Sequence, residues 1–204
     1  MGLNNDKILV FKNAFESKCF QLIVGAYNNV VVDKSISLNL EENDISAILH
    51  HNITLNPLSI KWQIFSKTEN YIYKENRKIE KGFASKQSRI DFVFSVFHTN
   101  LRFEYFIEAK NLNENDSALK RRYIDTGINS YISKKYENGS LVGYLIEGNL
   151  DLTISGINSL LKKDGRNTEV LQRKTFKLHK DYFESEHKEV GVLKHLIFEF
   201  ANNL

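Results

Sequence analysis

Two apolar runs of the sequence decide the fold: Arg89-Ile90-Asp91-Phe92-Val93-Phe94 and Leu101-Arg102-Phe103-Glu104-Tyr105-Phe106-Ile107-Glu108-Ala109-Lys110. Both are rich in aromatic and β-branched residues, and Thr99-Asn100 between them has the length of a two-residue hairpin turn. With that turn, the numbers of pairing residues sum to 199, so Asp91 pairs with Glu108. The pattern predicts an antiparallel hairpin whose two carboxylates lie opposite each other, with Lys110 on the same face.

The two faces of this predicted hairpin differ in chemistry. One face is almost wholly apolar and should pack on helices, because an antiparallel sheet buries its apolar side. It carries Ile90, Phe92, Phe94, Val96, Leu101, Phe103, Tyr105, Ile107 and Ala109. The other face gathers Asp91, Glu108 and Lys110 at the open end, away from the turn. A solvated outer face is the plain alternative, although it would scatter its charges along the strands.

Length and composition describe an ordinary globular chain. Its 204 residues are expected to form a single domain, 1–204, and its contents of 42% hydrophobic and 26% charged residues fit that class. The lone Cys19 excludes an internal disulfide framework and fits a reducing compartment. No signal peptide or apolar run of transmembrane length is visible. A cytoplasmic protein with no membrane partner is therefore expected.

The flanking segments predict the rest of the architecture. Helices are expected at 8–26, 40–51, 117–136 and 152–163. Short strands are expected at 30–32, 58–65, 71–73 and 141–146, and residues 192–200 form a last apolar element whose type the pattern leaves open. This order favours an α/β fold with a mixed β-sheet flanked by helices.

Basic residues cluster around the predicted carboxylates, although the net charge of the chain is only +3. One cluster is Lys120-Arg121-Arg122, and two more span residues 74–89 and 162–180. Such clusters suit a phosphate backbone that passes over the acidic site. Lysine-rich solvated loops are the alternative for any one of them.

These features resemble the PD-(D/E)xK nuclease superfamily, the fold of many restriction endonucleases. The resemblance covers roughly residues 39–148 and is carried by Leu40-Glu41-Glu42-Asn43-Asp44-Ile45, Asp91 and Glu108-Ala109-Lys110, then a helix and a strand. Ile90 stands where the superfamily has proline. A further pattern is similar to a subgroup from bacterial and phage-conflict gene clusters: Tyr123, Gly127-Ile128, Tyr131, Tyr136, Val142-Gly143-Tyr144 and Phe183-x-Ser185-x-His187.

The resemblance implies a restriction endonuclease-like core and a Mg²⁺-dependent DNA endonuclease in restriction or phage defence, with Mn²⁺ able to substitute. Asp91 and Glu108 are hard oxygen ligands for such a metal, and the backbone carbonyl of Ala109 would join them. Their mutual repulsion should raise the pKa of one carboxyl group when no cation is bound. Lys110 would orient or deprotonate the attacking water and stabilise charge on the phosphate.

The fourth catalytic residue is expected to be Glu42, with Glu41 as its close rival on the same helix. Lys120, Arg121 and Arg122 are the predicted nucleic-acid-binding residues. The expected partner is DNA, with a homodimer if both strands are cut, and with room for a partner protein from a defence system. Two alternatives stay open: an RNase of the same fold, and a catalytically silent nuclease-fold module for nucleic-acid binding or assembly. Nucleotide-binding glycine loops and zinc-ligand spacings are absent from the sequence.

Overall fold

A computed structural model describes residues 5–37, 39–72, 88–98 and 101–201 of the 204-residue chain. The predicted turn at 99–100, the strand end at Tyr73 and the basic residues 74–86 lie outside the described residues. No helix in the described ranges combines the length and the apolar character needed to cross a membrane.

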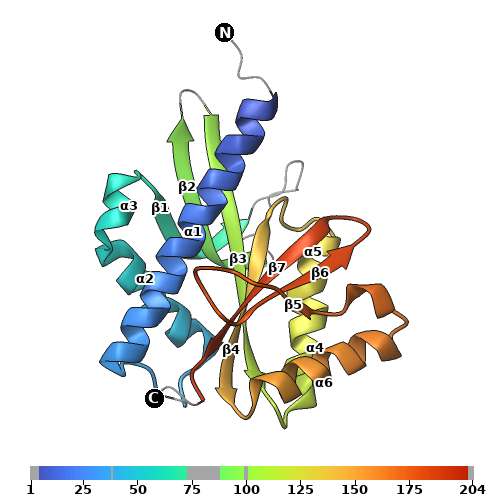
Figure 1. Cartoon of the computed structure of the whole chain (residues 1–204). Helices are drawn as coiled ribbons and strands as arrows, with labels where there is room; N and C mark the ends of the chain where they lie inside the picture. Colours follow the sequence, from blue (N-terminus) through green and yellow to red (C-terminus); the bar gives the residue numbers. More distant parts are fainter. Residues whose placement is uncertain (1–4, 38, 73–87, 99–100, 202–204) are drawn as a thin grey trace, which may run out of the picture.

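One mixed sheet organises the described part of the chain, with seven strands in the order β1-β2-β3-β4-β7-β6-β5 (Figure 1). The strands are β1 Phe65–Ile72, β2 Ser88–His98, β3 Leu101–Asn113, β4 Gly139–Glu147, β5 Gln172–Arg173, β6 Tyr182–His187 and β7 Gly191–Glu199. β3, β4 and β7 are parallel to one another, and the other neighbouring pairs are antiparallel. The predicted α/β class with a mixed sheet is confirmed.

The predicted register of the central hairpin is also confirmed. The pairs of β2 and β3 run from Phe92 with Ile107 to His98 with Leu101, and each pair sums to 199. The ladder ends one pair before Asp91 and Glu108, which leaves these two acids at the open end of the hairpin.

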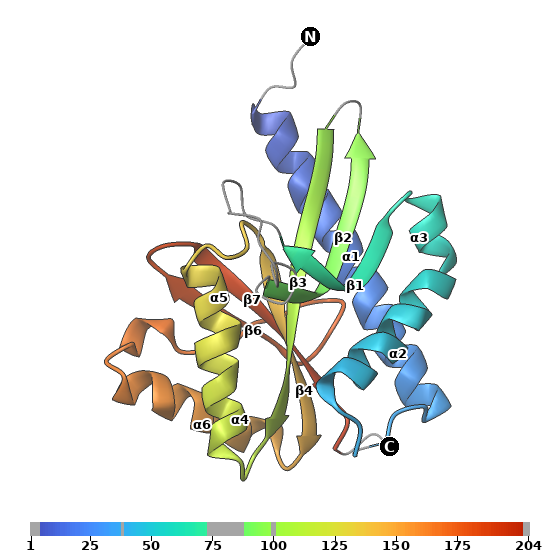
Figure 2. The same ribbon diagram turned by 180° about the vertical axis from the view of Figure 1, so that it is seen from behind.

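Helices cover both faces of the sheet (Figures 1 and 2). α1 (Asn5–Asp33), α2 (Glu42–Leu55) and the short α3 (Pro57–Lys61) precede the sheet in the chain. α4 (Ser117–Arg122), the π-helical turn η2 (Tyr123–Ile128) and α5 (Asn129–Ile132) form one nearly continuous rod, and α6 (Leu150–Lys163) and the 3₁₀ turn η3 (Asn167–Glu169) follow β4. One hydrophobic core lies between α1, α2 and the sheet, and a second lies between the sheet, η2 and α6.

Several details differ from the sequence prediction. One strand, β1, replaces the separate strands predicted at 58–65 and 71–73, and the helix predicted to reach residue 136 ends at Ile132. Residues 30–32 lie at the end of α1 and not in a strand. Residues 57–61 form α3, because Pro57 occupies the first helical turn and the Asn56 side chain caps it by accepting a hydrogen bond from the Leu58 amide. Ile90 packs in the second core, although Phe92, Phe94 and Ala109 lie in the first as predicted.

The misplacement of Ile90 has a local cause. On β1, Glu69 adopts a φ of 50° and has no partner in the β1–β2 ladder, which passes from Thr68 with Phe92 to Asn70 with Ile90. Such a left-handed residue interrupts the regular alternation of side chains in a strand pair. Asp91 lies opposite this irregularity, and Ile90 beyond it faces the second core while Phe92 faces the first.

Candidate active site

Four charged side chains converge at the open end of the hairpin. Nζ of Lys110 lies 2.8 Å from Oε1 of Glu108 and 3.2 Å from Oε1 of Glu42. The same ammonium lies 3.7 Å from Oδ2 of Asp91. All four residues are buried, with exposed fractions from 4% for Lys110 to 7% for Asp91 and Glu42. The structure therefore brings together the four predicted catalytic residues.

Asp91 is held by the main chain of the neighbouring strand. Its Oδ2 accepts a hydrogen bond of 2.6 Å from the backbone amide of Ala109. This carboxylate serves as acceptor where the main-chain ladder of β2 and β3 has ended. The contact fixes the carboxylate beside Glu108 and Lys110, the residues on either side of Ala109.

Glu42 reaches the cluster from the first residue of α2. Its Oε2 accepts a hydrogen bond of 2.9 Å from the backbone amide of Asn111, and its Oε1 lies 3.0 Å from a guanidinium nitrogen of Arg122. Glu41 is exposed and caps α2 in a capping box with Asp44. Of the two rival acids, Glu42 lies in the cluster and Glu41 does not.

Two buried tyrosines hold Glu108. The hydroxyl of Tyr136 donates a hydrogen bond of 2.8 Å to Oε2 of Glu108. The hydroxyl of Tyr131 accepts one of 3.2 Å from the Glu108 amide and lies 2.6 Å from the carbonyl oxygen of Ser140, to which it donates. Tyr131 and Tyr123 are both buried core residues. The orientation of Glu108 is therefore fixed at its carboxylate and at its backbone.

Burial and the neighbouring charges shift the pKa values of Asp91 and Lys110. Burial raises the pKa of Asp91 to about 7, and the carboxylates of Glu108 and Glu42 add to the rise while Lys110 opposes it. Burial alone would lower the pKa of Lys110, but the carboxylates of Glu108, Asp91 and Glu42 raise it above its usual range. Lys110 is therefore a protonated cation near neutral pH in this arrangement, and Asp91 is the acid that titrates there.

The donor atoms of this site suit a hard cation. Asp91, Glu108 and the carbonyl of Ala109 supply oxygen ligands of the kind that Mg²⁺ prefers. In the described ranges, no group of three or more histidine, cysteine, aspartate and glutamate side chains is arranged to hold a metal ion. The ammonium of Lys110 lies among the carboxylates and donates to the Ala109 carbonyl. A metal ion would fit among these oxygen atoms once the ammonium of Lys110 has moved aside.

The three predicted nucleic-acid-binding residues differ in their surroundings. Lys120 is buried, and its ammonium donates to the carbonyl oxygen of Glu114. Arg121 forms an ion pair with Asp164. The side chain of Arg122 is 50% exposed and contacts Glu42, so it alone of the three borders the carboxylate cluster. Their contact with nucleic acid stays a prediction.

A second buried polar cluster joins β6, β7, η2 and η3, and we call it the His–Ser relay. Oγ of Ser185 lies 2.6 Å from Nε2 of His187 and 2.8 Å from Nε2 of His195. Nδ1 of His187 lies 2.6 Å from Oε2 of Glu169, and Nδ1 of His195 lies 2.9 Å from the Tyr123 hydroxyl. Burial lowers the pKa of His187 and lowers that of His195 to about 3, so both rings are neutral. The subgroup pattern in the sequence named Tyr123, Ser185 and His187, but it did not predict their contacts with His195 and Glu169.

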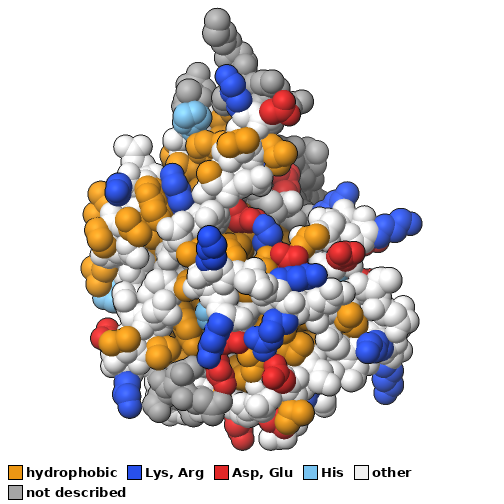
Figure 3. Space-filling view, in the orientation of Figure 1, with side chains coloured by type: hydrophobic (Ala, Val, Ile, Leu, Met, Phe, Trp, Pro, Cys, Tyr) orange, Lys and Arg blue, Asp and Glu red, His pale blue; other side chains and the backbone are white. Residues whose placement is uncertain are grey.

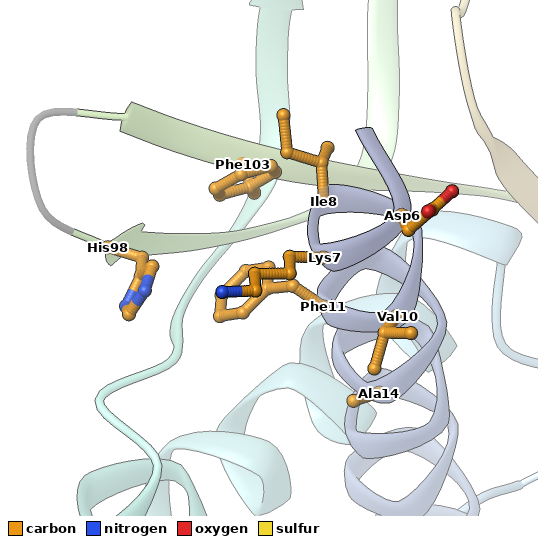
Figure 4. A pocket seen from close by; sticks show the side chains of 8 residues that line it. All are labelled: Asp6, Lys7, Ile8, Val10, Phe11, Ala14, His98 and Phe103. Carbon is orange, nitrogen blue, oxygen red and sulfur yellow. The ribbon is translucent and has the colours of Figure 1, made fainter. Parts of the chain in front are cut away.

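Hydrophobic surface gathers away from the carboxylates. Figure 3 shows apolar side chains on one flank of the molecule, over α2 and α3, and near the start of α1. An apolar pocket of about 480 Å³ lies at the turn end of the hairpin, where Phe11 of α1 stacks on His98 and contacts Phe103 (Figure 4). It lies at the opposite end of β2 and β3 from Asp91 and Glu108, so it is separate from the charged site.

The site as a whole combines two carboxylates from adjacent strands, a third from a helix, and a lysine among them. Comparisons of the chain with protein-family models, curated proteins and solved structures find no match. A functional conclusion for this protein therefore depends on the geometry and charge of the site itself.

Proposed function

We propose that the chain is a metal-dependent endonuclease that hydrolyses phosphodiester bonds in DNA. The observation that carries this proposal is the burial of Glu42, Asp91 and Glu108 around Lys110, where α2 meets the two strands of the central hairpin. Buried charges are costly unless they are fully compensated. Here three carboxylates meet two cations, Lys110 and Arg122, so one negative charge is left when all are ionised. A bound divalent cation would offset this charge and leave one positive charge, which an anionic phosphate would balance.

Each residue has a role that follows from its contacts. Asp91 and Glu108 would hold Mg²⁺ or Mn²⁺ with the Ala109 carbonyl, and the metal would polarise the phosphate and activate a water. Lys110 would stabilise the charge that builds on the phosphate, because its raised pKa makes it a cation and a poor base. Glu42 positions Lys110 and Arg122, with which it forms ion pairs.

The silent-module alternative has one observation in its favour. The ammonium of Lys110 lies among the three carboxylates, so the charged groups compensate one another in large part without a metal. A buried network of this kind can serve to specify a fold. The two functions differ in one measurable respect, because a structural network gains little from Mg²⁺ and turns over no nucleic acid.

The decisive experiment incubates the purified protein with plasmid, linear duplex DNA, single-stranded DNA and RNA, each with Mg²⁺, Mn²⁺ or EDTA. We expect metal-dependent cleavage of DNA by the wild type. Lys110→Ala should lose most cleavage while keeping metal binding, which calorimetry measures. Asp91→Ala and Glu108→Ala should lose metal binding as well. Lys188→Ala is the matched control, because Lys188 is an exposed lysine that ends another Glu-x-Lys sequence, Glu186-His187-Lys188.

Two outcomes would count against the nuclease. Cleavage that survives substitution of Asp91, Glu108 and Lys110 would place the chemistry elsewhere. Absence of cleavage, together with Mg²⁺ binding that is too weak to detect, would favour the silent module. Cleavage of RNA alone would identify the RNase of the same fold. If the product is a double-strand break, the active species should be a homodimer, because cutting two strands takes two sites. Restriction or phage defence is the biological setting that the resemblance suggests.

A further inference from the structure

A larger cavity, of about 950 Å³, is lined in part by Tyr136, whose hydroxyl donates to Glu108 of the carboxylate cluster. It follows the edge of β3, where this strand meets α1 and the segment 134–138 that precedes β4. Pairing of β3 with β4 begins at Phe106, so within the described strands the stretch from Arg102 to Tyr105 pairs with β2 alone. We call this cavity the edge groove.

The charged residues that line the edge groove are mostly basic. Arg102 and Glu104 form an ion pair with each other, which cancels their charges. The other charged side chains in the described part of the lining are Lys12, Lys134, Lys135 and Glu137. Lys134 has a φ of 54°, a left-handed backbone that is uncommon for lysine and costs conformational energy. An anionic ligand is therefore the complement of this groove.

Aromatic rings form the other part of the lining. Tyr71, Phe103 and Phe106 are partly exposed in the groove, and the Arg89 guanidinium lies 5.1 Å from the centre of the Tyr71 ring. Phe106 stacks on Tyr136 with ring centroids 5.8 Å apart. Lys135 lies 4.7 Å from the centre of the Tyr136 ring. Aromatic faces beside lysines are the surface on which unpaired bases stack while their phosphates are neutralised. Bases inside a duplex have no free face for such contacts.

Tyr136 connects the edge groove to the carboxylate cluster. It lines the groove, and its hydroxyl donates to Glu108, which also contacts Lys110. A chain lying in the groove would therefore bring its backbone to the acids that the nuclease proposal assigns to the metal. The groove is also separate from Lys120, Arg121 and Arg122, which do not line it.

We propose that the edge groove binds a single-stranded segment of nucleic acid and leads it to the carboxylate cluster. The proposal rests on the proposed function, because it assigns a substrate class to the same site. It changes the expected substrate from plain duplex DNA to nucleic acid with an unpaired stretch, such as an end, a gap or a flap.

The test measures binding of the full-length protein in EDTA, so that no cleavage interferes. Fluorescence anisotropy follows labelled oligothymidine, oligouridine and a blunt hairpin duplex over a range of salt. The wild type should bind the single strands more tightly than the duplex. The oligothymidine and oligouridine arms then identify DNA or RNA as the source of the strand.

Two variants separate charge from stacking. Lys134→Glu with Lys135→Glu should weaken single-strand binding at least tenfold. It should also lower the salt slope by about 1.4 units, since each phosphate contact in a single strand contributes roughly 0.7. Tyr71→Leu should weaken binding roughly tenfold at an unchanged slope, because base stacking releases no counterions. Lys34→Glu with Lys188→Glu is the charge-matched control, because both lysines are exposed and neither lines the groove.

Three results would overturn the edge groove. The first is a Lys134→Glu, Lys135→Glu protein that binds single strands as tightly as the wild type. The second is an equal loss of binding in the control pair, and the third is a wild type that binds the duplex as tightly as single strands. Unchanged urea midpoints in the variants will show that a loss of binding is not a loss of folding. If the wild type cuts duplex DNA and the groove variants bind single strands as the wild type does, the groove proposal is refuted and the nuclease proposal is not. A wild type that binds single strands through the groove, yet cuts no nucleic acid with either metal, overturns the nuclease alone.

Discussion

Replacing Asp91 by asparagine should stabilise the folded protein, and the gain should grow with pH. The folded-state pKa of Asp91 is raised from 3.8 to about 7, so the folded protein prefers the protonated acid. In the unfolded chain Asp91 ionises near its ordinary pKa, so the unfolded state is stabilised as pH rises above that value. In the folded state Asp91 ionises only above pH 7, so the folded state is stabilised only there. The wild type therefore loses stability over this window, and asparagine removes the loss.

The size of the effect follows from the shift. One pKa unit corresponds to about 1.4 kcal/mol, so the rise from 3.8 to about 7 amounts to on the order of 4 kcal/mol above pH 7. At pH 5 the unfolded acid is already ionised, and the expected gain is roughly 1.5 kcal/mol. Asparagine keeps an oxygen that can accept the hydrogen bond from the Ala109 amide, so the geometry need not change.

Urea unfolding in EDTA at pH 5 and pH 8 measures this difference. Asp125→Asn is the control, because the side chain of Asp125 is 51% exposed and its ion pair with Arg121 is 4.0 Å long. Added Mg²⁺ should stabilise the wild type at pH 8 and not Asp91→Asn. The reasoning would be refuted by an Asp91→Asn protein that is less stable than the wild type at pH 8. A gain of equal size at both values of pH would refute it too.

Three further substitutions test the surroundings of the cluster. Tyr131→Phe should cost about 1–3 kcal/mol in urea unfolding, because it leaves the buried amide of Glu108 without its acceptor. Gly143→Ala should cost about 1–3 kcal/mol in the same assay, because an added Cβ would lie 2.5 Å from Cδ1 of Leu112; unaltered stability would mean that the core relaxes freely. Glu42→Gln should lower the pKa of Lys110 by removing one of its carboxylates, which a pH titration of the lysine by NMR detects; a higher pKa would contradict the charge balance described here.

The hairpin could be predicted from the sequence because its signals are local. A strand alternates its side chains with a period of two, and a short turn fixes which residues face each other. These rules are enough to place Asp91 opposite Glu108 and Lys110 beside them. The same reasoning left Glu42 and Glu41 as rivals, since both begin the helix. What separates them is the contact of Glu42 with the Asn111 amide, between residues 69 positions apart.

The errors came from segments where local preference and tertiary packing disagree. Three consecutive valines at 30–32 favour a strand, yet they continue a 29-residue helix that packs along the sheet. The α3 helix had a readable signal, because asparagine followed by proline is a good helix start. The facing of Ile90 goes with a left-handed Glu69 in the neighbouring strand, which no pattern in the hairpin itself contains.

The hydrogen bonds of the His–Ser relay are fixed in one donor-to-acceptor direction. Glu169 can only accept when ionised, so Nδ1 of His187 must donate to it and Nε2 must accept from Ser185. Ser185 then accepts from Nε2 of His195, whose Nδ1 accepts from the Tyr123 hydroxyl. Every proton in this buried chain is thus set by one carboxylate at its end. Neutralising Glu169 would remove the asymmetry along the whole chain of hydrogen bonds, and the tautomer of His195, three hydrogen bonds away, would report it.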